Sequence, residues 1–273
     1  MDTCIAVAAE GFGTTFQGLV YDQLRRLLPP RHALLECAIP NWQDSALARG
    51  RLLGLLDERP LALIAICLRP DFATVAGFRD RGIPIVLVDE RAEGASTVAS
   101  DNLKGGYLAG QHLVRKGRRS LAVVTGPVRD YNAMQRMRGV ANALSEGGLP
   151  LPADGVIEAP AYSYHDGLNA MARLLAGPRK VDGVVCAAGD TCATGLLVAA
   201  RHRGVKVPDD LAVIGWDDAP LAATTDPPLT TMSQSLETIA RETLRLAVAE
   251  TTASLLRPQA VLLEPRLVIR ASA

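Results

Sequence analysis

Two aspartates directly follow short apolar runs, and both could bind a polar ligand. Asp89 follows residues 85–88, and Asp217 follows residues 213–216. If these runs are parallel strands, both carboxylates stand at the carboxyl edge of a sheet, where ligands of open α/β sheets bind. A carboxylate accepts hydrogen bonds from hydroxyl groups, and bonds to a charged acceptor are strong. The two aspartates therefore predict a site for a hydroxylated ligand.

Arg136 could supply hydrogen-bond donors to the same site. It follows Gly126 and Pro127, and the pattern places it in the first turn of a helix. A guanidinium presents its donors in a fixed fork, so with Asp217 it suits a polyhydroxyl ligand or one with a carboxylate or ring amide. Two structural roles stay open. Arg136 could pair with a carboxylate only to brace the two lobes, and Asp217 could cap a helix or turn.

The other motifs give little support for a cofactor, a metal or catalysis. Gly11, Gly13 and Phe16 imitate the dinucleotide pattern GxGxxG, but Phe16 stands where close helix packing requires the third glycine. We therefore expect no nicotinamide cofactor, and Phe16 is better suited to form a flat apolar platform for a sugar or ring. Asp217 and Asp218 have no third ligand at a suitable spacing, and neither GxSxG nor HExxH occurs, so we expect no metal and no such nucleophile.

The histidines and cysteines predict no chemistry either. His112 and His202 fall within expected helices beside polar residues, so we expect both side chains to be solvated. The number of cysteines is odd and there is no CxxC pair, which indicates buried thiols in a reducing compartment rather than disulfides. The five cysteines are Cys4, Cys37, Cys67, Cys186 and Cys192.

The elements that must position these residues follow from the hydrophobic pattern. Short apolar runs rich in branched residues predict buried parallel strands, and amphipathic stretches between them predict helices. Strand–helix alternation of this kind is typical of an α/β chain with parallel sheets and helices on both faces. The predicted strands are residues 4–8, 33–37, 62–67, 83–88, 120–125, 155–158, 183–187 and 212–216.

The alternation occurs in two blocks. Strand–helix units fill roughly residues 3–95 and again roughly residues 118–218, and residues 96–101 lead directly into a glycine-rich helix start. A helix after residue 235 and two extended runs, 260–263 and 267–270, remain. The pattern predicts two similar lobes to which the end of the chain returns, with a ligand site in the cleft between them.

Composition agrees with this organisation and excludes some functions. A chain of 273 residues with 48 % hydrophobic residues suffices for two domains with full cores. The formal net charge is zero, so the segment lacks the basic excess of a duplex-binding domain. The sequence shows neither a secretion signal nor an apolar stretch long enough to span a bilayer, so we expect a soluble, cytoplasmic protein with no membrane partner.

Several motifs together resemble the lac repressor/galactose repressor family of bacterial transcription regulators. They match in order and spacing along essentially the whole chain: VASDN (98–102), RMRGV (136–140), DTCATG (190–195), RGVKVPDDLAVIGWDD (203–218) and DPPLTT (226–231), with Gln234 three residues further on. The resemblance implies a periplasmic-binding-protein-like fold with three crossovers near residues 99–100, 233–236 and 263–265. The N-terminal lobe would comprise 1–99 plus 236–263, and the C-terminal lobe 100–235 plus 264–273.

The resemblance also implies a function. It implies a homodimer that binds a small effector, usually a sugar or related metabolite, and that reaches operator DNA only through a helix-turn-helix headpiece expected ahead of Asp2. The chain departs from the family's usual residues at 13–15, Gly189 and Trp216, which leaves the identity of the effector open. The family's effector contacts fall on Phe16, Asp89, Arg136, Tyr162, Asp217 and Gln234, and Asp190 lies beside a further contact position.

Two other functions fit the same fold. A sugar-binding protein of a transport system would share the architecture, but the expected lack of a secretion signal argues against it. An α/β enzyme could use Asp89 or Asp217 as a base, and turnover of the bound ligand would reveal it. We expect a regulator core rather than an enzyme, in which effector binding shifts the population of two conformations.

Overall fold

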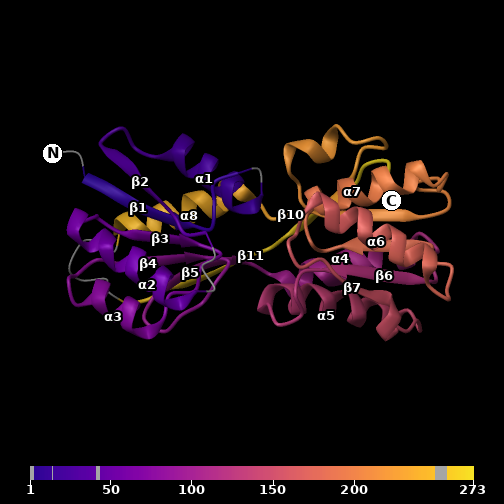
Figure 1. Ribbon diagram of the computed structural model, residues 1–273, viewed down its shortest axis with the longest axis horizontal. Helices are drawn as coiled ribbons and strands as arrows, with labels where there is room; N and C mark the ends of the chain where they lie inside the picture. Colours follow the sequence, from indigo (N-terminus) through magenta and orange to yellow (C-terminus); the bar gives the residue numbers. More distant parts are fainter. Residues whose placement is uncertain (1–2, 14, 41–43, 250–256) are drawn as a thin grey trace. The chain divides into compact units, whose positions relative to one another are not determined.

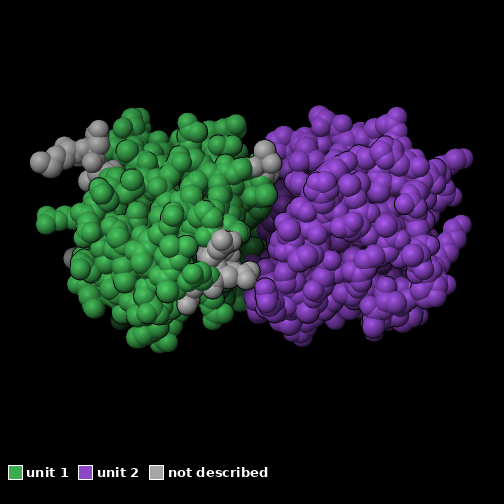
Figure 2. Space-filling view, viewed as in Figure 1, with its two compact units in different colours: residues 1–100, 235–263 green, residues 101–234, 264–273 purple. Residues whose placement is uncertain are grey.

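The computed structural model describes residues 3–13, 15–40, 44–249 and 257–273, which form two compact units, coloured separately in Figure 2. Unit 1 comprises Met1–Ser100 and Ser235–Leu263, and unit 2 comprises Asp101–Gln234 and Glu264–Ala273. The chain therefore crosses between the units three times. Two α/β lobes joined by three crossovers confirm the predicted fold class.

The described residues of unit 1 form a six-stranded parallel sheet in the order β11-β5-β4-β3-β1-β2 (Figure 1). Successive residues of β1 face opposite ways: Ile5 and Val7 pack toward α1 and α8, whereas Ala6 and Ala8 pack toward α2 and α3. Helices on both faces explain why β3 and β4 are apolar throughout. The elements are β1 (Thr3–Ala9), α1 (Phe16–Leu27), β2 (His32–Ala38), α2 (Ser45–Gly54), β3 (Leu63–Ile66), α3 (Phe72–Arg79), β4 (Ile85–Val88), β5 (Ser96–Ser100), α8 (Leu236–Ala249) and β11 (Ala260–Leu263).

Unit 2 repeats this design with one antiparallel edge strand. Its described residues form a sheet in the order β12-β10-β9-β8-β6-β7, in which β12 pairs antiparallel with β10. Helices α4 and α5 cover one face, and α6 and α7 cover the other. The elements are α4 (Asn102–Arg115), β6 (Leu121–Thr125), α5 (Tyr131–Glu146), β7 (Val156–Glu158), α6 (Tyr164–Ala176), β8 (Gly183–Cys186), α7 (Asp190–His202), β9 (Ala212–Asp217), β10 (Thr230–Ser233) and β12 (Arg266–Val268).

Glycines allow α4 and α5 to pack with their backbones in contact. A Cβ atom on Gly106 would stand 2.0 Å from the carbonyl oxygen of Arg136, and one on Gly139 would stand 2.1 Å from the carbonyl oxygen of Leu103. No side chain fits at either distance, so both positions require glycine. The contact between Gly106 and the Arg136 carbonyl therefore fixes the backbone of α5 at Arg136.

Every predicted strand is present, with ends that differ by at most two residues, but two strands were not predicted. β5 and β10 contain Ser and Thr rather than an apolar run, yet their residues are buried. Distant segments satisfy their polar groups. The Ser272 hydroxyl accepts from the Thr230 N–H at 2.8 Å and donates to the Val213 carbonyl at 2.6 Å, and the Ser96 hydroxyl accepts from the Gln259 N–H at 2.9 Å.

The predictions for cysteines and for one histidine need correction. Cys186 and Cys192 are buried, but Cys4, Cys37 and Cys67 are partly exposed. Cys4 lies near the start of β1, Cys37 lies on the edge strand β2, and Cys67 directly follows β3. No disulfide joins any of these five described cysteines.

His202 is exposed as predicted, whereas His112 is only partly exposed. The Nε2 atom of His112 is buried without a hydrogen-bond partner among the described residues, and burial lowers the pKa of this imidazole. The helix pattern alone did not show that the chain end at Ala273 lies against this side chain. Separately, no helix in the described ranges combines the length and apolar character needed to cross a bilayer.

Candidate functional site

All seven predicted contact residues lie beyond the carboxyl end of a parallel strand. In unit 1, Phe16 begins α1 after β1, and Asp89 directly follows β4. The unit 2 residues are Arg136 (in α5, after β6), Tyr162 (after β7), Asp190 (first residue of α7, after β8), Asp217 (last residue of β9) and Gln234 (after β10). Since parallel strands end at a common edge, the five residues of unit 2 gather along one edge of its sheet.

The two unit 1 residues differ in exposure. Asp89 is 6 % exposed and has a left-handed backbone conformation, with φ of 60°. Phe16 is partly buried against the apolar core that includes β1 and α1. The close approach in this loop falls at Gly18, where a Cβ would lie 1.5 Å from the Gly13 carbonyl oxygen. The loop therefore differs from a dinucleotide-binding turn.

The Arg136 guanidinium is buried, and its contacts include two hydrogen bonds and an aromatic ring. Its Nε donates to Asn102 Oδ1 at 2.7 Å, and its Nη1 donates to the Ala187 carbonyl at 2.9 Å. The guanidinium carbon lies 4.6 Å from the centre of the Trp216 ring, in cation–π geometry. Ala187 follows β8 and Trp216 is the penultimate residue of β9, so the charge lies at the carboxyl ends of these strands.

Arg136 lies in the second turn of α5, not in the first as predicted. The helix begins at Tyr131, where Asp130 caps it by accepting hydrogen bonds from two backbone N–H groups. Gly126 and Pro127 therefore belong to the preceding loop.

Asp217 lies beside this arginine and is bonded to Gln234. Its Oδ1 accepts from Gln234 Nε2 at 2.6 Å, and its backbone φ is 106°. Burial raises the pKa of Asp217 to about 6, although the charge of Arg136 and the Gln234 hydrogen bond act in the opposite direction. The carboxylate does not cap the following short helix, whose N-cap residue is Ala219. At neutral pH Asp217 is thus mainly ionised and can accept hydrogen bonds.

Asp190, which we expected beside an effector contact position, is almost completely buried. It is 1 % exposed, and its two oxygens accept from Thr231 Oγ1 at 2.6 Å and from the Ala219 N–H at 2.8 Å. Burial, with the nearby charge of Asp217, raises the pKa of Asp190 to about 8. Asp190 therefore ties α7 to β10 and to the loop after β9.

Tyr162 joins two loops at the same sheet edge. Its hydroxyl donates to Asp130 Oδ2 at 2.8 Å, and its ring covers Gly126, where a Cβ would stand 1.9 Å from the hydroxyl oxygen. The structure thus brings Arg136, Asp217 and Gln234 together with Asp190, whereas this bond of Tyr162 connects it to the start of α5.

Sequence reasoning missed three residues that build the site. Asn102 and Trp216 hold Arg136, and Thr231 holds Asp190. Asn102 and Trp216 stood within the recognised motifs, but nothing in the sequence showed that they contact Arg136.

Among the described residues, no group of three or more His, Cys, Asp or Glu side chains is placed to hold a metal ion.

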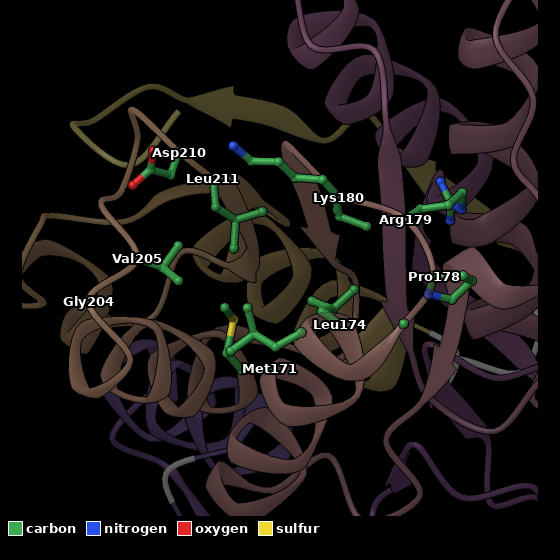
Figure 3. Close-up of a pocket in the computed structure, with 12 residues that line it drawn as sticks. Met171, Leu174, Pro178, Arg179, Lys180, Gly204, Val205, Asp210 and Leu211 are labelled. Carbon is green, nitrogen blue, oxygen red and sulfur yellow. The ribbon is translucent and has the colours of Figure 1, made fainter.

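A separate pocket of about 480 Å³ opens at the other edge of the unit 2 sheet. Val181 and Leu211 precede β8 and β9, which places it at the amino ends of these strands. Figure 3 shows Met171 and Leu174 of α6 converging with Leu211 on its apolar floor. Because parallel sheets bind ligands at their carboxyl ends, this pocket is distinct from the candidate site.

Comparison with known proteins agrees with the fold. The family model of the periplasmic binding protein-like domain matches residues 110–273. The HTH-type transcriptional repressor PurR of Escherichia coli is 27 % identical over 235 residues, which cover 85 % of this chain and 68 % of the repressor. The family match includes the part of the chain that carries Arg136, Asp217 and Gln234.

Solved structures extend the likeness to the whole chain. The transcriptional regulator CelR in complex with cellobiose is 27 % identical, with a TM-score of 0.86 over 100 % of this chain and 85 % of that one. A LacI family regulator from Enterococcus faecium with bound ribose shares the fold, with a TM-score of 0.87 at 22 % identity over 99 % of this chain and 98 % of that one. These relatives are named as transcription regulators rather than enzymes. The chain therefore belongs to the periplasmic binding protein-like domain family, as a core of the lac repressor/galactose repressor type.

Proposed function

We propose that this chain is the effector-binding and dimerisation core of a transcription regulator, and that its effector is a small hydroxylated metabolite, foremost a sugar. The observation that carries the proposal is the pair formed by Arg136 and Asp217 at the carboxyl edge of the unit 2 sheet. A buried guanidinium held by three contacts lies beside a carboxylate held by Gln234. Phe16, Asp89, Tyr162 and Asp190 are further proposed contacts or supports.

The chemistry of the pair fits neighbouring hydroxyl groups. Each sugar hydroxyl can both donate and accept, so one hydroxyl can accept from Arg136 while the next donates to Asp217. Both side chains are already held by protein contacts, so little conformational entropy is lost when they bind a ligand. The cellobiose complex of the 27 % identical relative CelR supports a sugar as the first class to test.

Control of DNA is proposed to pass through a headpiece and a homodimer. The zero formal net charge gives this segment no basic excess with which to bind a duplex. Coupling between effector and operator would amount to about 1–3 kcal/mol and would act equally in both directions. Sedimentation at roughly tens of micromolar should show a dimer, and tight salt-sensitive binding of DNA by this segment alone would contradict the proposal.

The decisive experiment is calorimetric titration with a panel of pentoses, hexoses and disaccharides that includes ribose and cellobiose. We expect at least one member to bind saturably and without turnover, and Arg136→Ala to weaken that binding. Arg138→Ala is the matched control, because Arg138 is exposed on the same helix. A panel in which no sugar binds, or an Arg136→Ala variant that binds like the parent chain, would overturn the assignment.

A further inference from the structure

The indole ring of Trp216 is fully buried between Arg136 and α4. The side chain is 0 % exposed, and one face of its ring carries the Arg136 guanidinium at 4.6 Å. The edge of the ring lies against Gly105, where a Cβ would stand 2.7 Å from the Cη2 atom of Trp216. The ring therefore fills a space that exists only because residue 105 has no side chain.

Trp216 interacts with Arg136 through its ring face and not through a hydrogen bond. The Trp216 Nε1 atom is buried and has no hydrogen-bond partner within the described part of the chain. Such a donor costs free energy in a core, so the indole N–H does not explain the presence of this residue. The ring face does, because an aromatic ring attracts a cation most strongly when water is excluded.

The three contacts of Arg136 come from three different elements. Asn102 begins α4, Ala187 follows β8, and Trp216 belongs to β9. The two hydrogen bonds lie in the plane of the guanidinium, because its N–H groups do, and the ring adds a cation–π contact at the guanidinium carbon. Without the ring, the long side chain would keep rotational freedom out of that plane, and ordering it on binding would reduce affinity.

We propose that Trp216 is a positioning residue for effector binding: its ring holds the guanidinium of Arg136 flat at the carboxyl edge of the unit 2 sheet, where it meets the effector's oxygen atoms. This inference rests on the proposed function, but the placement of Arg136 can be tested without any ligand. Trp216 does not touch the effector in this proposal. It acts through Arg136, and its depth is set by Gly105.

Asp217 reports the position of Arg136 electrostatically. The arginine charge lowers the pKa of Asp217, which burial raises to about 6, so displacement of the guanidinium would raise that pKa further. Asp190 and Asp218 are the neighbouring carboxyl groups. Asp190 has a pKa of about 8 and is neutral near pH 6, and Asp218 is paired with Arg270 at 2.7 Å. The Gln234 amide carries no charge.

The first test follows the Asp217 carboxyl by NMR in ¹³C-aspartate-labelled protein as the pH is changed. We expect Trp216→Leu to raise the midpoint by roughly half a pH unit or more, because the guanidinium is no longer held. Trp216→Phe keeps a ring and removes no hydrogen bond, so its midpoint should stay near that of the parent chain. Leu113→Ala, in the same apolar cluster, is the control for a loss of packing alone and should leave the midpoint unchanged.

A second measurement decides the question even if Trp216→Leu does not fold. Protons above an aromatic ring are shifted upfield, so the Arg136 Cδ protons of the parent chain should resonate upfield of those of Arg138. Absence of that shift in the folded parent, or equal Asp217 midpoints in folded Trp216→Leu and the parent, would overturn the proposal.

The functional test is a double-mutant cycle with cellobiose as the probe. Trp216→Leu should weaken cellobiose binding about tenfold, corresponding to about 1.4 kcal/mol, and should have no added effect in an Arg136→Ala background. Equal losses in both backgrounds would show that Trp216 acts independently of Arg136 and would overturn the proposal. If cellobiose does not bind the parent chain, the member of the sugar panel that does bind replaces it as the probe. If no sugar binds, the proposed function is wrong, and the Asp217 midpoints still decide whether Trp216 positions Arg136.

Discussion

The side-chain amide of Gln234 donates to Oδ1 of Asp217 at 2.6 Å. Gln234 is the last residue of unit 2 before the chain enters unit 1, and Asp217 is the last residue of β9. A residue at a crossover is therefore bonded directly to a carboxylate that we propose as an effector contact. A change in the charge of Asp217 changes that hydrogen bond, because an ionised acceptor binds a donor more strongly than a neutral one.

Effector binding should depend on pH through Asp217. The ionised form accepts hydroxyl hydrogen bonds, and its pKa is about 6, so affinity should be constant above that pH and fall by up to about tenfold per pH unit below it. Titrations between roughly pH 5 and pH 8 measure this. Gln234→Glu places a second carboxyl against Asp217 and should move the fall to higher pH. A flat profile would contradict the assigned role.

Arg136→Ala should lose effector affinity without losing the fold. Removal of a charged hydrogen-bonding partner costs roughly 1.5–3 kcal/mol, or about 10- to 150-fold in affinity. Titration and thermal melting should be measured on the same preparation, because the bracing role would instead appear as a large fall in melting temperature. Asp217→Asn should be milder, since the amide keeps one acceptor.

Asp190 should make the fold less stable as the pH rises. Its pKa in the folded protein is raised to about 8, so its neutral form stabilises the fold fully below the unfolded pKa, and this contribution is lost as the pH rises through about 8. Between roughly pH 6 and pH 8, urea unfolding should show a decline on the order of 1 kcal/mol per pH unit. Asp190→Asn should remove that slope, whereas Asp209→Asn, at an exposed position, should keep it. An unchanged slope in Asp190→Asn would show that another group titrates.

Gly139→Ala should destabilise unit 2 strongly. The new methyl group would lie 2.1 Å from the Leu103 carbonyl oxygen, so α4 and α5 must separate, at a cost of roughly 2–4 kcal/mol. Gly50→Ala is the matched control, because no atom lies within 4 Å of the added carbon in α2. That variant should be stabilised by about 0.5–1 kcal/mol, as expected for alanine within a helix. Chemical denaturation of both variants makes the comparison.

The parts of the fold that the sequence predicted are those set by local pattern. Apolar runs such as residues 213–216 identified strands, and their ends placed Asp217 and Asp89 correctly at strand ends. β10 was missed because Thr230 and Thr231 look polar, and their burial depends on Ser272 and Asp190, about forty residues away. Local pattern does not contain such partners.

For the site, the motifs identified the residues but not the contacts between them. The motif identified Arg136, but its helix start was misjudged because the Asp130 cap was overlooked. The stack on Trp216 requires strand β9 to meet α5 in space, and the enclosed state of Asp190 requires β10 beside it. These relationships arise only when the sheet has assembled, so residue types could be predicted and their contacts could not.

The crossovers also determine when each lobe can be completed during synthesis. Unit 1 needs α8 and β11, which lie after the whole of Asp101–Gln234, and unit 2 needs β12, which comes later still. A ribosome that has translated the first 234 residues has therefore finished neither lobe. A nascent chain at that stage exposes the face of unit 1 that α8 later covers, including Val86 and Val88. Premature termination between residues 235 and 263 should thus yield a chain in which both lobes are incomplete, and cellular proteases should remove it.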